Sequence, residues 1–168
     1  FNHCPQEKLE AWQGFLGIEI YNGLVRAHPG NPLATDRWDM LLGQGRRVWG
    51  FANDDAHHAG NEGIAWNMVQ SVSNDAPAIL EALRAGRFYA STGVTIDSVR
   101  VSGNSIRVST RDAQRIVASI DYGRRVAHAD APEIAFTVPN DVECSYVRFE
   151  CYGPGESMAW TQPVFIGP

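Results

Sequence analysis

One stretch of the chain, residues 48–58, constrains the fold more than any other. It reads Val-Trp-Gly-Phe-Ala-Asn-Asp-Asp-Ala-His-His. Its first half is apolar, β-branched and aromatic, which is typical of a strand buried on both faces. Two carboxylates and two imidazoles follow at once. Because ligands of α/β proteins bind beyond the carboxyl ends of parallel strands, we expect a functional site here.

Asp55 and His57 are the candidate metal ligands of this stretch. They supply one carboxylate oxygen and one imidazole nitrogen, a donor pair that suits zinc, manganese or iron. Asp and His also occur in capped turns. The Asp-x-His pattern by itself therefore leaves a capped turn as the alternative to a metal site.

The first part of the chain has the pattern of an α/β protein. The order of strand, loop, helix and strand in residues 17–52 is the crossover that builds parallel sheets. Residues 64–69 fit either a strand or irregular structure. The pattern predicts helices at 5–12, from a cap at Thr35 or Asp36 to about Gly43, and at 76–85 after an Asp75 cap. It predicts strands at 17–22 and 48–52.

Two further polar residues of this part stand out. Glu19 lies on a strand that is otherwise rich in Ile and Tyr, so its carboxylate is either hydrogen-bonded in a site or exposed at an edge. His28 precedes Pro29 in a loop rich in Gly, Pro and Asn, which predicts a plain surface turn.

From about Gly93 the pattern changes to short alternating runs separated by turns. Such runs at regular intervals predict an antiparallel β-sandwich over residues 94–168, after an α/β region at 1–93. The predicted strands are 94–101, 106–109, 116–121, 134–138, 146–152 and 163–166.

Composition excludes several classes of protein. The chain is 44% hydrophobic and 20% charged, with a net charge of −5 and no basic stripe, which argues against nucleic acid as a partner. It has no apolar run near the ~20 residues that cross a bilayer, and no visible signal peptide.

Three cysteines fit no disulfide framework and favour a reducing, cytoplasmic compartment. Because Phe1 is not a start methionine, we expect the sequence to be cut from a longer one.

The ordered landmarks resemble the C-terminal part of PHP-family (polymerase and histidinol phosphatase) metal-dependent phosphoesterases. The resemblance covers nearly the whole chain. Its landmarks are Asn-His-Cys-Pro at 2–5, Gly-Ile-Glu-Ile-Tyr-Asn at 17–22, Trp-Gly-Phe-Ala-Asn-Asp-Asp-Ala-His at 49–57 and Gly-Arg-Phe-Tyr-Ala-Ser-Thr-Gly at 86–93.

The resemblance implies a fold and a metal site. The family fold is a distorted barrel of seven βα units, so residues 1–93 would be its last two units and residues 94–168 an appended sandwich. Asp55 and His57 match the family's final Asp-x-His ligands, and His3 matches the histidine of its His-Pro motif. Glu19, Asp54 and His58 would surround these ligands. The implied cofactors are divalent zinc, manganese or iron, and the implied substrate is a phosphate ester.

Two departures from the family pattern change the functional expectation. Cys4 separates His3 from Pro5, whereas His28-Pro29 keeps the dipeptide but follows Glu19. The family's opening His-x-His and its bridging glutamate have no counterpart in the sequence. We therefore interpret the chain as a truncated portion of a metal-dependent hydrolase that is inactive as given.

The alternative function is a non-catalytic binding or interaction module built on the sandwich. A sugar- or protein-binding face would use Trp160, Tyr152 and Tyr146, although aromatic residues on strands more often belong to a core.

The sequence also predicts a homo-oligomer that associates through the α/β part. The edge of strand 17–22 and the apolar faces of the helices that carry Trp38 and Ile79 would drive it. The alternative is that the sandwich folds over this edge and restores a monomer.

Overall fold

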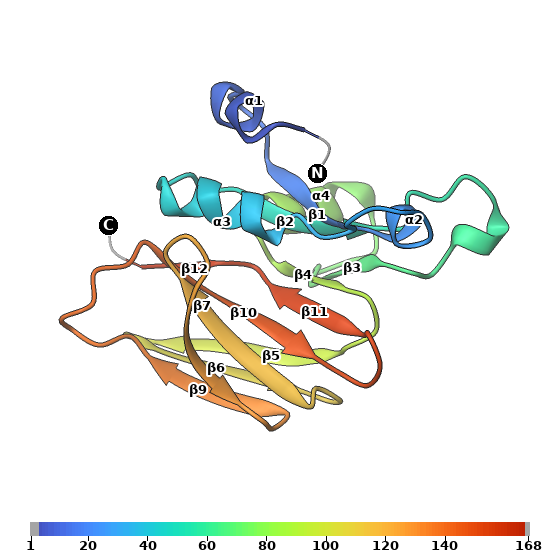
Figure 1. The fold of residues 1–168 in the computed structure, drawn as a ribbon. Coiled ribbons are helices and arrows are strands. Elements are labelled where there is room, and N and C mark those ends of the chain that lie inside the picture. The colour runs from blue at the N-terminus through green and yellow to red at the C-terminus, as the bar shows by residue number, and fades with distance from the viewer. Residues whose placement is uncertain (1–3, 167–168) are drawn as a thin grey trace.

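The computed structural model describes residues 4–166, which form three layers. Figure 1 shows an α/β layer at the top, a large sheet beneath it and a small sheet at the bottom. The α/β layer contains one parallel pair of strands, whereas every other strand pairing is antiparallel. The fold is thus mixed α and β with mostly antiparallel sheets, compatible with the predicted sandwich.

The α/β layer follows the predicted order of elements. It consists of α1 (Gln6–Ala11), β1 (Gly17–Asn22), α2 (Gly23–Arg26), α3 (Thr35–Gly43) and β2 (Trp49–Asn53). Strands β1 and β2 form a two-stranded parallel sheet. Helix α3 begins after Ala34, whose methyl group cannot cap it, so the predicted cap at Thr35 or Asp36 was wrong.

In the next part of the chain, two strands, β3 (Trp66–Val69) and β4 (Phe88–Ser91), join the large sheet instead of the parallel pair. The other elements of this part are η1 (Ala59–Asn61) and α4 (Ala76–Arg84). Asp75 caps α4 as predicted, because its carboxylate accepts from the Ala78 N–H at 3.0 Å. The ambiguous segment at 64–69 contains strand β3, which pairs with β4.

The remaining strands complete the two antiparallel sheets. The seven-stranded sheet has the order β3-β4-β11-β10-β7-β8, with β12 paired to β10, and the three-stranded sheet has the order β5-β6-β9. The seven-stranded sheet therefore contains strands from both sides of residue 93, because β4 pairs with β11. The strands are β5 (Ile96–Ser102), β6 (Ser105–Thr110), β7 (Arg115–Ile120), β8 (Arg124–Ala129), β9 (Glu133–Thr137), β10 (Tyr146–Tyr152), β11 (Met158–Thr161) and β12 (Val164–Phe165).

Two hydrophobic cores lie on opposite faces of the seven-stranded sheet. The lower core joins this sheet to the three-stranded one and includes Ile106, Val108 and Phe149. The upper core joins it to the α/β layer and includes Trp38 and Trp160. Alternate residues of β10 point into the two cores, which is why this strand is buried almost throughout.

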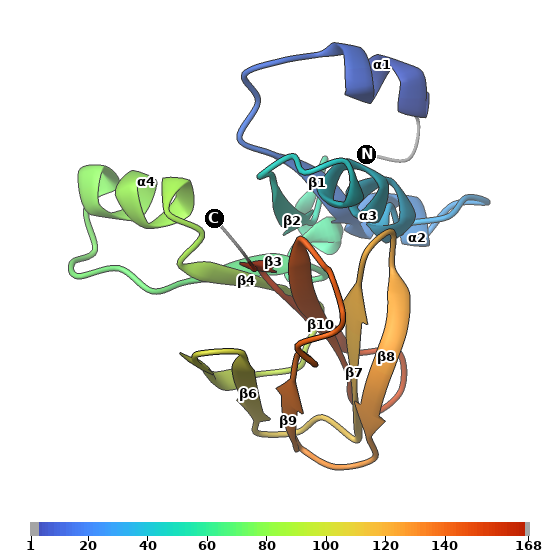
Figure 2. The same ribbon diagram turned by 90° about the vertical axis from the view of Figure 1, so that its left-hand side faces the viewer.

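The apolar face of α3 is covered by the seven-stranded sheet. Trp38, Leu41 and Leu42 are all buried within the upper core. The sequence-based expectation that the Trp38 helix presents an uncovered face was therefore wrong. Helix α4 differs, because Figure 2 shows it set apart from α3 above β3 and β4, and its Leu80 is 48% exposed.

Polar groups occupy the outer edges of the parallel pair. The amide of Gln162 bonds to both the N–H and the C=O of Gly50, at 2.9 and 2.8 Å. The amide of Asn67 does the same for Ala52, at 3.1 and 2.8 Å. On the other side, the Ala34 N–H donates to the Ile20 carbonyl. These contacts replace the neighbouring strands that a barrel would provide, and residues 4–166 form no barrel.

Two further observations concern the residues that the structure describes. None of their helices combines the length and the apolar character needed to span a membrane. All three cysteines, Cys4, Cys144 and Cys151, are free thiols.

Candidate functional site

The candidate site lies at the carboxyl ends of β1 and β2. The two strands run parallel, with Glu19 opposite Phe51 and Asn22 opposite Asn53, so they end at the same edge of the sheet. The polar side chains that follow these ends consequently meet there, as the sequence predicts.

Asn22 is the centre of the polar contacts at this edge. Its side-chain amide donates to Glu19 Oε2 at 3.0 Å and to Asp55 Oδ2 at 3.2 Å. Its Oδ1 accepts from the Val25 N–H at 3.0 Å and so caps α2. Asn22 is buried, and one buried amide therefore joins a carboxylate of β1 to a carboxylate that follows β2.

Glu19 receives a second amide at its other oxygen. The Asn53 side chain donates to Glu19 Oε1 at 2.9 Å. Asn53 is positioned in turn by Asn67, whose amide donates to Asn53 Oδ1 at 3.3 Å. Glu19 is half-buried and hydrogen-bonded, which is the first of the two alternatives that the sequence left open for it.

Asp55 has an unusual backbone conformation. Its φ is +54°, in the left-handed region that residues other than glycine seldom adopt. Such conformations cluster at functional sites, because the surrounding structure must hold them in place. The Asp55 side chain is 43% exposed, and Asn22 contacts its Oδ2 and not its Oδ1.

The ring of His57 lies beside Asp55. His57 Nδ1 is 2.7 Å from the backbone carbonyl oxygen of Asp55 and 4.0 Å from its Oδ1. Because a carbonyl only accepts, Nδ1 carries the proton in this contact and Nε2 is left with a free lone pair. The His57 ring is well exposed, so Nε2 is accessible to a ligand.

Asp54 shapes the loop that carries these residues. Its carboxylate accepts from the backbone N–H groups of Gly63, Ile64 and Ala65 at 2.7–2.8 Å. Partial burial raises the pKa of Asp54, but the three N–H donors outweigh it and hold the pKa below its usual value. Asp54 therefore closes the loop between β2 and β3.

The other predicted residues are not brought to this cluster. His58 is exposed, and so is His28, which follows α2. His3 lies outside the described residues. Within residues 4–166, no three His, Cys, Asp or Glu side chains gather closely enough to hold a metal ion. Of the three aromatic residues considered for a binding face, Trp160 and Tyr146 are buried and only Tyr152 is half-exposed.

Sequence reasoning missed Asn22 and Asn67. An Asn at a strand end before Gly is typical of a helix cap, and Asn22 does cap α2. Its second role, toward Glu19 and Asp55, depends on the pairing of β1 with β2. The signal that could have found it is the coincidence of an amide and a carboxylate at two adjacent parallel strand ends.

The fold and this cluster define a mixed α and β protein with a polar site at the ends of a parallel strand pair. Comparison with protein-family models, curated proteins and solved structures finds no match.

Proposed function

We propose that the chain carries part of a divalent metal site of a PHP-type phosphoesterase. In this proposal Asp55 and His57 are the ligands, and β1 and β2 correspond to two strands of the family's barrel. Bound divalent ions would lower the pKa of a water molecule and polarise a phosphate ester. Zinc, manganese and iron fit a donor pair of one carboxylate and one imidazole.

The observation that carries the proposal is the link that Asn22 makes between Glu19 and Asp55. Its amide contacts both carboxylates within 3.2 Å. It bonds to Asp55 at Oδ2, which leaves Oδ1 available to a ligand. The contact between His57 Nδ1 and a backbone carbonyl adds to this, because ligating histidines usually donate their second N–H to such a group. Both candidate ligands are thus oriented by neighbouring groups.

The same geometry limits what residues 4–166 can do alone. They bring together one carboxylate and one imidazole, with Glu19 held back by two amides. A cluster of two metals needs further ligands, from His3, from a segment that precedes the given sequence, or from another chain. We therefore propose weak metal binding and no useful hydrolysis by this chain by itself.

Metal titration of matched variants tests the proposal. We expect calorimetry to show weak Mn²⁺ or Zn²⁺ binding that a chelator removes completely. Asp55→Asn and His57→Ala should each abolish it, because each removes one of two ligands. His28→Ala is the matched control, since His28 is exposed and outside the cluster.

Three outcomes would count against the proposal. Equal metal binding by the Asp55 and His57 variants would place the site elsewhere. Tightly held metal that survives chelation would mean a larger ligand set. Rapid hydrolysis of a phosphomonoester by the chain alone, lost in His57→Ala, would show a complete site.

The alternative proposal is a non-catalytic binding module built on the sandwich. One observation favours it, namely an open pocket on β7 and β8 that lies away from the carboxylate cluster.

A further inference from the structure

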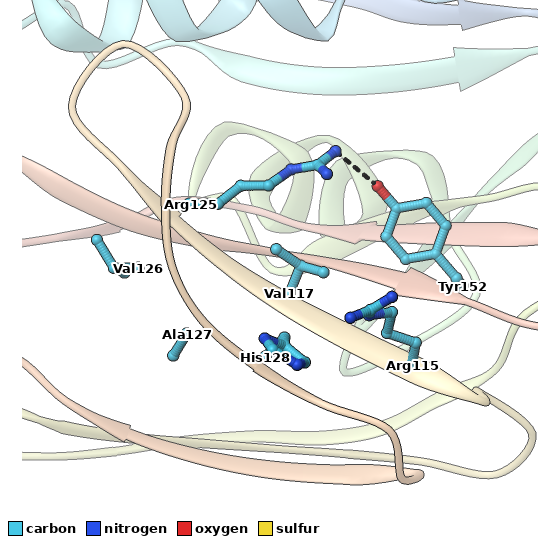
Figure 3. Close-up of a pocket in the computed structure, with 7 residues that line it drawn as sticks. All are labelled: Arg115, Val117, Arg125, Val126, Ala127, His128 and Tyr152. Carbon is cyan, nitrogen blue, oxygen red and sulfur yellow. Dashed lines mark hydrogen bonds between the residues drawn. The ribbon is translucent and has the colours of Figure 1, made fainter.

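An open pocket of about 590 Å³ lies on the face of the seven-stranded sheet formed by β7, β8 and the end of β10. Figure 3 shows the side chains of Arg115, Arg125, His128 and Tyr152 arranged around Val117. The polar residues of its lining are two arginines, a histidine and a tyrosine, and no carboxylate belongs to the lining.

Strand register explains why these side chains share one face. Arg115 lies opposite Tyr152, and Val117 lies opposite His128. Directly opposed residues of antiparallel strands point to the same side of a sheet. A bulge after Ala118 places Arg125 opposite Ser119, which brings its guanidinium to the same side.

This pocket lies beyond the part of the seven-stranded sheet that helix α3 covers. Along β10, Tyr146 and Arg148 point to the same side as Tyr152, because they alternate. Helix α3 covers that side at Tyr146 and Arg148 through its Asp39. Past Glu150 the face is open, and the Arg125 side chain is 68% exposed.

Two carboxylates outside the lining hold the guanidinium groups. Asp130 Oδ1 is 3.2 Å from Arg115 Nε, and buried Glu150 Oε2 is 3.7 Å from the Arg125 guanidinium. Within residues 4–166, the terminal N–H groups of Arg115 have no other partner. The arginines of both ion pairs are exposed, and these contacts leave N–H groups of both arginines available to a ligand.

Tyr152 is a neutral part of the same arrangement. Its hydroxyl donates to Glu150 Oε2 at 2.6 Å and accepts from Arg125 at 3.3 Å. Burial, together with the hydrogen bond to Glu150, raises the pKa of Tyr152 to about 12. The hydroxyl is therefore protonated at neutral pH, and it adds no negative charge to the pocket.

We propose that this pocket binds the oxyanion group of a small organic anion, held by Arg115 and Arg125. Two guanidinium groups that line one concavity suit a phosphate or carboxylate group, since a guanidinium offers several N–H donors. The apolar side chain of Val117 borders the same concavity and would contact the apolar part of such a ligand. The site does not depend on the metal proposal, because it shares no residue with it.

Titration with defined anions tests the proposal on the whole chain in the presence of a chelator. We expect inorganic phosphate and phenyl phosphate to shift the amide resonances of β7, β8 and the end of β10 in a saturable manner. Phenyl phosphate should bind more tightly, because it also buries apolar surface. Benzoate distinguishes a carboxylate preference from a phosphate preference, and benzyl alcohol is the neutral control.

Charge-removing variants locate the binding. Arg115→Gln and Arg125→Gln should each weaken phenyl phosphate binding by about tenfold or more, because each loses charge-assisted hydrogen bonds. Arg124→Gln is the matched control, since Arg124 neighbours the pocket in sequence but pairs with Asp121 outside it. Thermal melting confirms that the variants are folded.

The proposal fails under either of two results. One is the absence of saturable shifts with phosphate, phenyl phosphate and benzoate alike. The other is an equal loss of affinity in Arg124→Gln, which would show that only general surface charge attracts the anions.

Discussion

At the scale of single residues, Asn22 connects local structure to the candidate site. Its Oδ1 caps α2, while its amide contacts the carboxylates of Glu19 and Asp55. Because this side chain is buried, water cannot replace its hydrogen bonds. The conformation of the loop after β2 therefore depends on one amide of β1.

We expect Asn22→Ala to lower the free energy of unfolding by about 1–3 kcal/mol, since it removes a cap and leaves two carboxylates without their shared donor. Urea unfolding measures the change. Asn104→Ala is the control, because Asn104 is exposed and its side chain bonds only to Asn140 at the surface. Equal effects of the two substitutions would contradict the central position of Asn22.

Glu150 makes stability depend on pH in the acidic range. Burial raises the pKa of Glu150, but the charge of Arg148 and the Tyr152 hydroxyl outweigh it and hold the pKa below its usual 4.5. A carboxyl whose pKa is lower in the folded state contributes stability above its unfolded pKa, and this is lost as pH falls through the folded pKa.

We therefore expect the melting temperature to fall as pH decreases below about 4.5. In Glu150→Gln this decline should be shallower, because glutamine does not titrate. Calorimetric melting between neutral pH and pH ~3 gives both slopes. Identical slopes would show that the acid sensitivity comes from other carboxyl groups, such as Asp54.

At the scale of elements, a buried ion cluster fixes α3 on β10. The Arg148 guanidinium contacts both oxygens of Asp39 at 2.7 and 2.5 Å and Glu150 at 3.0 Å. The Tyr146 hydroxyl donates to Asp39 at 2.8 Å. Burial of such charges is costly, so the cluster specifies where α3 docks more than it adds stability.

Arg148→Met should destabilise the fold by about 3–5 kcal/mol, because it leaves two buried carboxylates without their cation. Arg107→Met is the exposed counterpart, since Arg107 pairs with Glu133 at the surface, and it should cost about 0–1 kcal/mol. Urea unfolding of both variants compares them directly. A cost for Arg148→Met as small as that for Arg107→Met would contradict the role of the cluster.

Sequence periodicity predicted the elements that bury one clear apolar face. It found β1, α3, β2 and α4, together with most strands of the sandwich. It missed β4 and β11, which have only four residues each, and β8, half of whose residues are exposed arginines and histidine. Short or polar strands owe their structure to paired neighbours, and periodicity does not report those neighbours.

Pairing between distant segments accounts for the remaining differences. The pattern marks the Trp38 face of α3 as apolar, but it does not say that Tyr146 and Trp160 cover it. Likewise, Gln162 and Asn67 read as polar loop or strand residues, although their amides complete the edge of β2. The site was predicted at Asp55 and His57 because they directly follow a strand, and Glu19 was placed beside them, whereas the link through Asn22 was not predicted.

At the scale of the whole molecule, the seven-stranded sheet serves both halves of the chain. It covers α3 on one face and the three-stranded sheet on the other. Seven large apolar residues are exposed in residues 4–93. Four of them lie on or between β3 and α4, namely Trp66, Met68, Val72 and Leu80, and the others are Trp12, Leu16 and Met40. Met68 is 47% exposed, Leu80 is 48% exposed, and Trp66 is also partly exposed. Strand β3 is moreover the edge of its sheet.

We expect this β3–α4 surface to join two copies of the chain, because exposed edges and apolar patches drive association. Light scattering should then give a mass that rises from 18.5 kDa toward twice that value with concentration. Leu80→Lys should weaken the association by about tenfold or more, since it removes a leucine side chain from the interface. Val101→Lys, at a comparably exposed valine of β5, should leave it unchanged. A constant mass of 18.5 kDa, or a dimer that only Val101→Lys disrupts, would contradict association through this surface.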